Sequence, residues 1–293
     1  MNLLASAKNV YSQSGEDGII DAILSKVPKL DRWCVEFGAW DGIYLSNTRN
    51  LIENRAYQGV LIEPNVESFA KLRANTKRFA GVTLLQEFVG FSARDGLDSL
   101  LSKTDCPRDF DFLSIDVDGN DIHIWRAIDQ YRPKLVCIEF NPTIPTEVLF
   151  AQPADPKINW GASLAALVRL GKEKSYELVC VNNLNAFFVT SDLFPLFCLS
   201  DNSPAALRPA DAPRVMVFSG YDGTLFLTED ISFLWHGFTS SAEDIQVLPA
   251  FLRKYPLNYN AVERGCARAY QLFRRARKAL RSSKRRSGPS PSN

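Results

Sequence analysis

The sequence has no apolar run close to the roughly 18 residues that a membrane-spanning helix needs. Its first residues include only a short apolar stretch, interrupted by Lys8, which is not the pattern of a secretory signal. The hydrophobic share of 46% and the charged share of 23% are ordinary for a soluble globular protein. We therefore expect no transmembrane segment and a location in the cytoplasm.

The six cysteines lack any C-x-x-C spacing, the pattern that is typical of a zinc or redox site. The regularly spaced pairs of a disulfide framework are also missing. Cys34, Cys137 and Cys180 lie inside apolar runs, where a free thiol behaves as a small hydrophobic side chain. The cysteines are therefore expected to be reduced and structural.

Acidic residues are nearly absent from the C-terminal end of the chain, although the whole sequence has a net charge of only +1. Residues 261–293 contain ten Lys/Arg and one acid, which leaves 24 bases and 32 acids, a balance of −8, in residues 1–260. Apolar residues, among them Ala267, Leu272, Phe273 and Leu280, lie among these bases. The pattern fits a basic amphipathic helix on an anionic membrane or nucleic acid, or a plain solvated helix, and there is no stronger nucleic-acid signal. The closing SSKRRSGPSPSN is expected to be disordered.

What the sequence does contain is an alternation of strand-length apolar runs with helix-period segments, the pattern of a parallel sheet built from βαβ units. The predicted strands are 32–37, 58–63, 82–86, 111–116 and 134–140. The predicted helices between them are 45–54, 66–77, 95–102, 121–130 and 162–171, and a further helix starts near Ser14 and ends before Pro28. Two β runs, 176–181 and 186–190, flank an Asn-rich turn and predict an antiparallel hairpin.

Acidic residues stand at four of the predicted strand ends: Glu36, Glu63, Asp116 and Glu139. In an open parallel sheet, ligands bind beyond the carboxyl ends of the strands, where the strand order reverses. The glycines of the motif E-x-G-x-x-x-G, Gly38 and Gly42, permit a tight turn and a close approach to a ligand, although a purely structural turn has the same pattern.

Two further strand ends suggest nucleoside recognition. Glu63 lies 25 residues beyond Gly38, close to the separation at which an acid reaches ribose hydroxyls. Glu87 and Phe88 combine an acceptor for an exocyclic amine with a ring that can stack on a base. The plainer interpretations are a solvated strand-end acid and a core phenylalanine.

The fourth strand ends in a crowded acidic turn that contains Asp116, Asp118 and Asp121. Like charges at this spacing repel unless a cation, a base or a substrate donor offsets them. The D-x-D-G-N-D pattern resembles the start of a calcium loop, but Ala127 stands where that loop needs a bidentate Glu.

Glu139 and Asn141, at the end of the fifth strand, point to one side and are expected to face the same crevice as Asp116. Such oxygens suit Mg²⁺ or Ca²⁺, and they equally suit proton transfer or hydrogen bonding to a hydroxylated substrate. We predict a catalytic set of Asp116, Asp118, Glu139 and Asn141, and leave open whether a metal binds there.

With these residues in view, the chain resembles an S-adenosylmethionine-dependent methyltransferase of the class I Rossmann-like fold, most of all the FkbM-type family. The matching motifs, within residues 12–192, are VEFGAWDG, GVLIEPN, DFLSIDVDGND and ELVCVNNLNAFFV. The resemblance implies an α/β fold with a seven-stranded, mostly parallel sheet, helices on both faces and a final antiparallel hairpin. We expect a helical lead-in (1–30), a cofactor-binding domain (31–192), an extension packed on the core (193–260), and a basic helix with a disordered tail (261–293).

The resemblance implies roles for the residues already singled out. The implied cofactor-binding residues are Glu36, Gly38, Ala39, Asp41, Gly42, Glu63, Glu87, Phe88 and Asp116. Glu36, Gly38 and Gly42 would shape the pocket for the methionine end, although Trp40 and Asp41 depart from the commoner residues in this loop. Glu63 would bind the ribose, residues 87 and 88 would flank the adenine, and Asp116 would lie beside the methyl group. The lead-in residues Gln13, Glu16 and Asp17 are expected to help close the site.

The expected reaction is O-methylation of a hydroxyl on a sugar or secondary metabolite, with a small molecule or glycan as acceptor. The alternatives are a binding module without catalysis and an NAD-dependent dehydrogenase, which the missing G-x-G-x-x-G disfavours. A phosphatase interpretation of Y-D-G-T-L fails because Gly220 stands where the nucleophilic aspartate is needed, so these residues predict a hairpin turn. His123 faces substrate or a helix surface, and His236 is expected to be structural.

Overall fold

The computed structural model describes residues 2–208 and 215–286 of the chain. The chain divides into two compact units, Met1–Pro213 and Arg214–Asn293. The boundary expected at residues 192 and 193 stays a prediction, and the end of the predicted disordered tail, 287–293, lies outside the described residues. Among the helices that the structure describes, none is long and apolar enough to cross a membrane.

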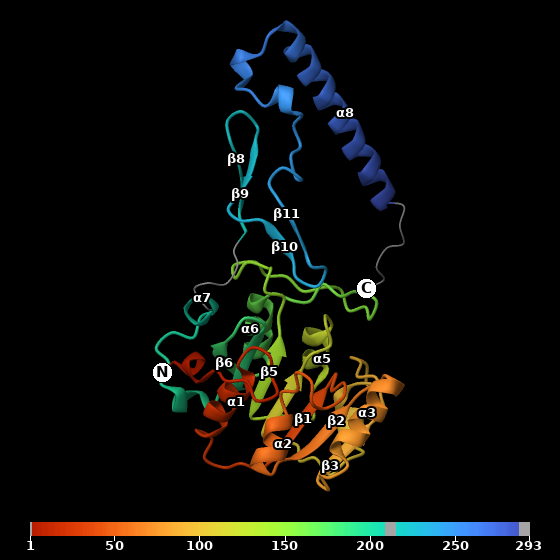
Figure 1. Cartoon of the computed structure of the whole chain (residues 1–293), viewed down its shortest axis with the longest axis vertical. Helices are drawn as coiled ribbons and strands as arrows, with labels where there is room; N and C mark the ends of the chain where they lie inside the picture. The colour runs from red at the N-terminus through yellow and green to blue at the C-terminus, as the bar shows by residue number, and fades with distance from the viewer. Residues whose placement is uncertain (1, 209–214, 287–293) are drawn as a thin grey trace. The chain divides into compact units, whose positions relative to one another are not determined.

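The first unit is built on a seven-stranded sheet (Figure 1). Its strands are β1 Trp33–Phe37, β2 Gln58–Ile62, β3 Val82–Leu85, β4 Phe112–Ile115, β5 Leu135–Glu139, β6 Tyr176–Val181 and β7 Asn185–Thr190. The strand order is β3-β2-β1-β4-β5-β7-β6, and β7 runs antiparallel to both of its neighbours whereas the other pairs are parallel. This arrangement confirms the predicted Rossmann-like sheet and its antiparallel hairpin.

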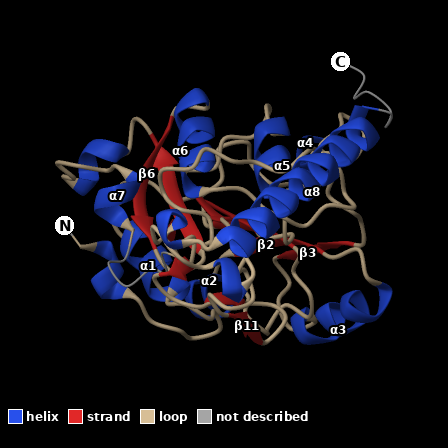
Figure 2. Cartoon of the chain, turned by 90° about the horizontal axis from the view of Figure 1, so that it is seen from above, coloured by secondary structure: helices blue, strands red, loops and turns tan. Residues whose placement is uncertain are grey.

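Helices cover both faces of the sheet (Figure 2). They are η1 Leu3–Ser6, α1 Glu16–Leu24, α2 Arg49–Arg55, α3 Val66–Thr76, α4 Leu97–Leu101, α5 Asp121–Ala127, α6 Leu164–Glu173, η2 Phe194–Phe197 and α7 Pro204–Leu207. Each helix predicted between the strands is confirmed, with ends that differ by a few residues. Capping side chains support the first turn of three of these helices, since Asn65, Ser163 and Ser203 accept from the backbone of α3, α6 and α7 respectively.

Alternation along the strands produces a separate apolar core on each face. Val35 and Phe37 of β1 pack in the cluster that includes α4, α5 and α6, whereas Cys34 packs in the cluster that includes α1, α2 and α3. The same parity holds along β4 and β5. Residues 36, 114, 116 and 139 therefore belong, by parity, to the face that α1 and α2 cover.

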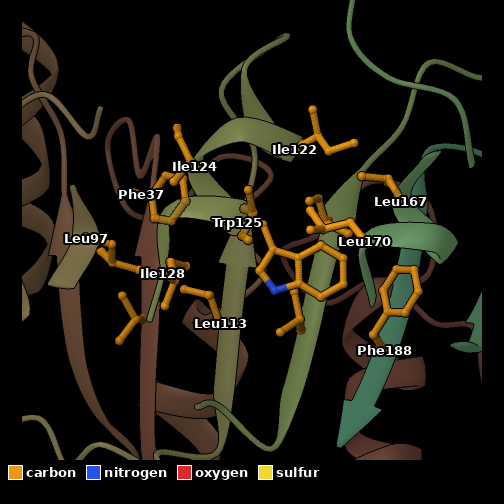
Figure 3. Close-up of a cluster of buried hydrophobic side chains, with 14 of the residues drawn as sticks. Phe37, Leu97, Leu113, Ile122, Ile124, Trp125, Ile128, Leu167, Leu170 and Phe188 are labelled. Atoms are coloured by element: carbon orange, nitrogen blue, oxygen red, sulfur yellow. The ribbon is translucent and has the colours of Figure 1, made fainter. Parts of the chain in front are cut away.

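Trp125 of α5 lies at the centre of one core (Figure 3). The centroid of its ring lies 4.9 Å from that of Phe188 and 5.7 Å from that of Tyr176, and only 1% of the residue is exposed. Gly171 of α6 packs against the same rings, because a Cβ there would lie 3.0 Å from Phe188 and 3.2 Å from Trp125. The glycine lets α6 approach the sheet closely.

The second unit contains two short hairpins and a long helix. β8 Val217–Ser219 pairs with β9 Leu225–Leu227, and β10 Ile231–Phe233 pairs with β11 Phe238–Ser240. The elements η3 Ala250–Leu252 and η4 Pro256–Asn258 precede α8 Ala261–Arg286. The hairpin turn predicted from Y-D-G-T is confirmed, with Gly223 in the left-handed region at φ +83°.

We predict that Trp125→Ala lowers the free energy of unfolding of the first unit by about 3–5 kcal/mol, because it leaves a cavity among Phe188, Tyr176 and α6. Trp160, which is 57% exposed, is the matched control, and Trp160→Ala should cost about 0.5 kcal/mol or less. Denaturant titration followed by circular dichroism measures both. Equal effects of the two substitutions would contradict the assignment of the core.

Candidate functional site

The parallel register of β4 and β5 brings Asp116 beside Glu139 at the carboxyl edge of the sheet. Ile115 is the register partner of Ile138, so Asp116 and Glu139, the residues that follow them, come level with each other. Oxygens of Asp116, Asp118 and Glu139 all lie within 4.8 Å of one another. The structure therefore brings together three of the four residues of the predicted catalytic set.

Burial is the main influence on the protonation of this cluster. Burial, together with the nearby charges of Asp121 and Asp118, raises the pKa of Asp116 to about 8. Burial, followed by repulsion from Asp116, raises the pKa of Glu139 to about 9. Both carboxyl groups therefore keep protons at neutral pH when no cation is present.

Asp121 shapes the turn that carries the cluster. Its Oδ1 accepts a hydrogen bond of 2.9 Å from the backbone N of Val117, and its Oδ2 accepts one of 2.8 Å from that of Gly119. Burial raises the pKa of Asp121 to about 6, although these two hydrogen bonds act in the opposite direction. Asp118 between them is exposed and left-handed at φ 55°.

Gly38 brings the turn after β1 against this cluster. It has a φ of +73°, and a Cβ at this position would lie 2.3 Å from the backbone oxygen of Asp116. Only glycine permits this approach, since both the space and the backbone conformation exclude a side chain. Gly42 is also left-handed, at φ +71°, and packs on Leu72 of α3.

The side chain of Glu36 accepts hydrogen bonds from three donors of the protein. Its buried carboxylate accepts hydrogen bonds from Ser46 Oγ at 2.7 Å, from Thr48 Oγ1 at 2.7 Å and from the backbone N of Asn47 at 2.8 Å. Burial raises the pKa of Glu36, and these three donors counteract that rise. Asn47 in turn donates to Ser114 Oγ of β4 at 3.1 Å. Glu36 thus holds the segment before α2 in place, and its predicted contact with a cofactor stays a prediction.

Glu63 links the end of β2 to the turn after β1. Its Oε2 accepts from the backbone N of Trp40 at 2.9 Å, and its Oε1 accepts from that of Asn65 at 2.8 Å. Each oxygen retains a second lone pair. The predicted ribose contact stays a prediction, and the geometry leaves acceptor capacity for it.

The remaining predicted cofactor residues have separate local roles. Ala39 is buried and donates its backbone N to Ile62 O, whereas Asp41 Oδ1 accepts from the backbone N of residues 43 and 44. Glu87 and Phe88 both lie exposed beyond β3, and Phe88 is 56% exposed. Phe88 is therefore outside the core, and its exposed ring is compatible with the predicted stacking on a base.

Asn141 is occupied by contacts within its own loop. Its Oδ1 accepts from the backbone N and Oγ1 of Thr143, and its Nδ2 donates to Trp160 O at 2.9 Å. His123 lies similarly engaged, with Nε2 2.8 Å from Gln152 O. The predicted catalytic role of Asn141 stays untested, and its amide is already used in positioning residues 141–143 and 160.

The lead-in contributes two buried carboxylates. Glu16 is fully buried and accepts from Asn182 Nδ2 at 2.7 Å and from Asn185 Nδ2 at 3.0 Å. Asp17 Oδ2 accepts from the backbone N of residues 10, 11 and 12. The Glu16 contacts attach the lead-in to the β6–β7 turn, the Asp17 contacts hold residues 10–12 within the lead-in, and Gln13 is exposed.

Asn185 is a candidate that sequence reasoning missed. It is the register partner of Glu139 in the antiparallel β5–β7 pair, so the two side chains share one face. Asn185 is 3% exposed, and its Oδ1 has no hydrogen-bond partner among the described residues. The sequence signal for Asn185 is the Asn-rich stretch, which by itself predicts only a turn.

Two cavities on the first unit lie away from these carboxylates. One, of about 270 Å³, is lined by residues that include Trp125, Lys174 and Tyr176. The other, of about 400 Å³, is lined by residues that include Ile122 and Arg169. Neither is lined by any predicted site residue, so the site rests on the carboxylate geometry.

No protein-family model and no curated protein matches this sequence. Solved structures that are similar in fold include three with low sequence identity.

The N-terminal domain of EvdMO1 with SAH bound has 10% identity and a TM-score of 0.42, over 61% of this chain and 82% of that chain. A SAM-dependent methyltransferase from Aquifex aeolicus has 10% identity and a TM-score of 0.35, over 57% and 86%. Precorrin-6y C5,15-methyltransferase from Geobacter metallireducens GS-15 has 19% identity and a TM-score of 0.36, over 62% and 90%. These likenesses concern the fold alone.

The raised pKa values of Asp116 and Glu139 predict a specific pH dependence of stability in metal-free buffer. The native protein keeps protons that the unfolded chain releases above about pH 5, so the free energy of unfolding should fall as the pH rises to about 9. Glu139→Gln should flatten this slope and raise the stability at pH 9 by on the order of 2 kcal/mol.

Urea titrations of both proteins at a series of pH values measure the effect. A wild-type slope that Glu139→Gln leaves unchanged would show that the native fold does not raise the pKa of Glu139.

Proposed function

We propose that this chain is an S-adenosylmethionine-dependent methyltransferase that transfers a methyl group to a hydroxyl of a small molecule. The observation that carries the proposal is the convergence of Asp116, Asp118 and Glu139 within 4.8 Å, at the carboxyl edge of the sheet. Gly38 brings the first turn against the same place.

The sheet topology supports this location for a cofactor. The strand order reverses between β1 and β4, and ligands of open α/β sheets bind at such a switch point. The residues that follow these two strands are the glycine turn, with Gly38 and Gly42, and the acidic turn, with Asp116. The proposal assigns the methionine end of the cofactor to this region.

For the nucleoside part, we assign Glu63 to the ribose hydroxyls, because each of its oxygens retains an acceptor lone pair after the bonds to Trp40 and Asn65. Phe88 and Glu87 are exposed beyond β3, next to β2 in the sheet. A stacking ring beside an acceptor carboxylate suits adenine.

A sulfonium already activates its methyl group, so the protein mainly has to align donor and acceptor. The acceptor hydroxyl must also lose a proton, and a buried carboxylate with a pKa near the working pH is suited to accept it. Asp116, with its pKa raised to about 8, is the proposed base, and Glu139 with a pKa of about 9 stays its protonated partner.

Oxygens of Asp116, Asp118 and Glu139 also fit a hard divalent cation such as Mg²⁺, which prefers carboxylate ligands. Such an ion would favour the ionised carboxylates and lower the pKa of an acceptor hydroxyl. Cation binding is a proposal, as are a sugar or secondary metabolite as acceptor, the FkbM-type assignment and the cytoplasmic location.

Cofactor binding is tested by calorimetry with S-adenosylhomocysteine. The wild-type chain should bind it, and Glu63→Ala should weaken binding by about tenfold or more through loss of the ribose contact. Glu67→Ala is the matched control, since Glu67 is an exposed carboxylate in the first turn of α3. Binding of NAD in place of S-adenosylhomocysteine would contradict the proposal and favour a dehydrogenase.

Catalysis is tested by the release of S-adenosylhomocysteine in the presence of pooled hydroxylated sugars and phenols. Asp116→Asn should lower turnover by about 10²–10⁴-fold, and the wild-type rate should rise with pH towards 8. Assays with and without Mg²⁺ separate a cation effect. Full turnover in the Asp116→Ala/Glu139→Ala protein would refute the assigned roles.

A further inference from the structure

The helix α8 packs on its own unit through a narrow face. Glu263, Ala267 and Tyr270 are its half-buried residues between 261 and 279, and all others in that stretch are exposed. The Tyr270 hydroxyl donates to Val247 O, and Glu263 pairs with Lys254. At 100° per residue, these three side chains lie within one 60° arc of the helix.

A different face of α8 is apolar. Val262, Ala269, Phe273 and Ala276 follow the helical period and lie in one arc, which Leu272 extends. Val262 is 74% exposed, Leu272 65% and Phe273 59%. The centre of this arc is turned about 120° from the face that packs on the unit, so the described residues of this second unit leave the apolar side chains largely uncovered.

The remaining arc of α8 is strongly basic. Residues 261–279 include six Lys/Arg and one acid, and that acid is paired with Lys254. Arg264, Arg275 and Lys278 are exposed on the side away from the apolar arc, whereas the exposed Arg268 and Arg277 border that arc, one on each side. The helix therefore offers an apolar stripe flanked by cations.

We propose that α8 binds the surface of a lipid bilayer that contains anionic lipids. Val262, Leu272 and Phe273 would enter the boundary between headgroups and acyl chains, while the arginines contact the anionic headgroups. The helix would lie along the surface, because it is too polar to span a bilayer. The inference is independent of the proposed methyl transfer and goes beyond it.

Charge and apolarity together favour this occupant. A nucleic acid would neutralise the basic arc but would leave Val262, Leu272 and Phe273 in water. A second copy of this chain would cover the apolar arc but would bring two basic helices together, which is unfavourable. An anionic bilayer removes the apolar side chains from water and also offers negative charge to the basic side chains.

Flotation of the full chain with vesicles tests the proposal. The protein should float with vesicles of equal parts phosphatidylcholine and phosphatidylglycerol, and it should not float with phosphatidylcholine alone. Leu272→Ser/Phe273→Ser should weaken partitioning by about a hundredfold. Gln271→Ser, an exposed position on the basic arc, is the matched control and should bind as the wild type does.

Several outcomes would overturn the inference. One is the absence of flotation with anionic vesicles, and another is flotation that Leu272→Ser/Phe273→Ser leaves unchanged. A third is a dimer in light scattering that these substitutions dissociate, without vesicle binding. A fourth is salt-sensitive binding of an RNA oligonucleotide that the substitutions leave intact, again without vesicle binding. Circular dichroism of each variant confirms that α8 is retained.

Discussion

The parallel alignment of β1, β4 and β5 is the constraint on which the rest of the site depends. Because these strands run in the same direction and in adjacent register, their carboxyl ends meet at one edge. Alternation then directs residues 36, 116 and 139 to a single face. The fold thus concentrates acidic groups where burial makes their ionisation unfavourable, and it must either supply donors for each or leave them protonated.

Some of these acidic groups receive hydrogen-bond donors, and others stay protonated. Glu36 receives three donors from residues 46–48, and Asp121 receives two backbone donors from its own turn. Asp116 and Glu139 lack comparable donors and respond with raised pKa values. Raised pKa values in a half-buried pair of carboxyl groups are of the kind found at functional sites, and the proposed role of Asp116 and Glu139 rests on them together with the geometry. The second unit differs, since its α8 leaves an apolar and a basic arc exposed.

Much of this architecture could be predicted from the sequence because hydrophobic period and strand-end chemistry are local signals. The apolar runs that end near Phe37, Ile115 and Glu139 predict strands, and the Asn-rich turn predicts the final hairpin. The partners of Glu36 could not be predicted, since they depend on how the segment before α2 folds back. For the same reason, the loop contacts of Asn141 and the position of Asn185 opposite Glu139 emerged only with the register of β5 and β7.

The central claim is that Asp116 and Glu139 form one half-buried pair of carboxyl groups whose ionisations influence each other. Carboxyl ¹³C NMR titration of the metal-free protein, with Asp116→Asn and Glu139→Gln used for assignment, tests it most directly. The account predicts that both resonances titrate above pH 7, and that each substitution lowers the midpoint of the remaining partner. Two independent transitions near pH 4 would contradict it.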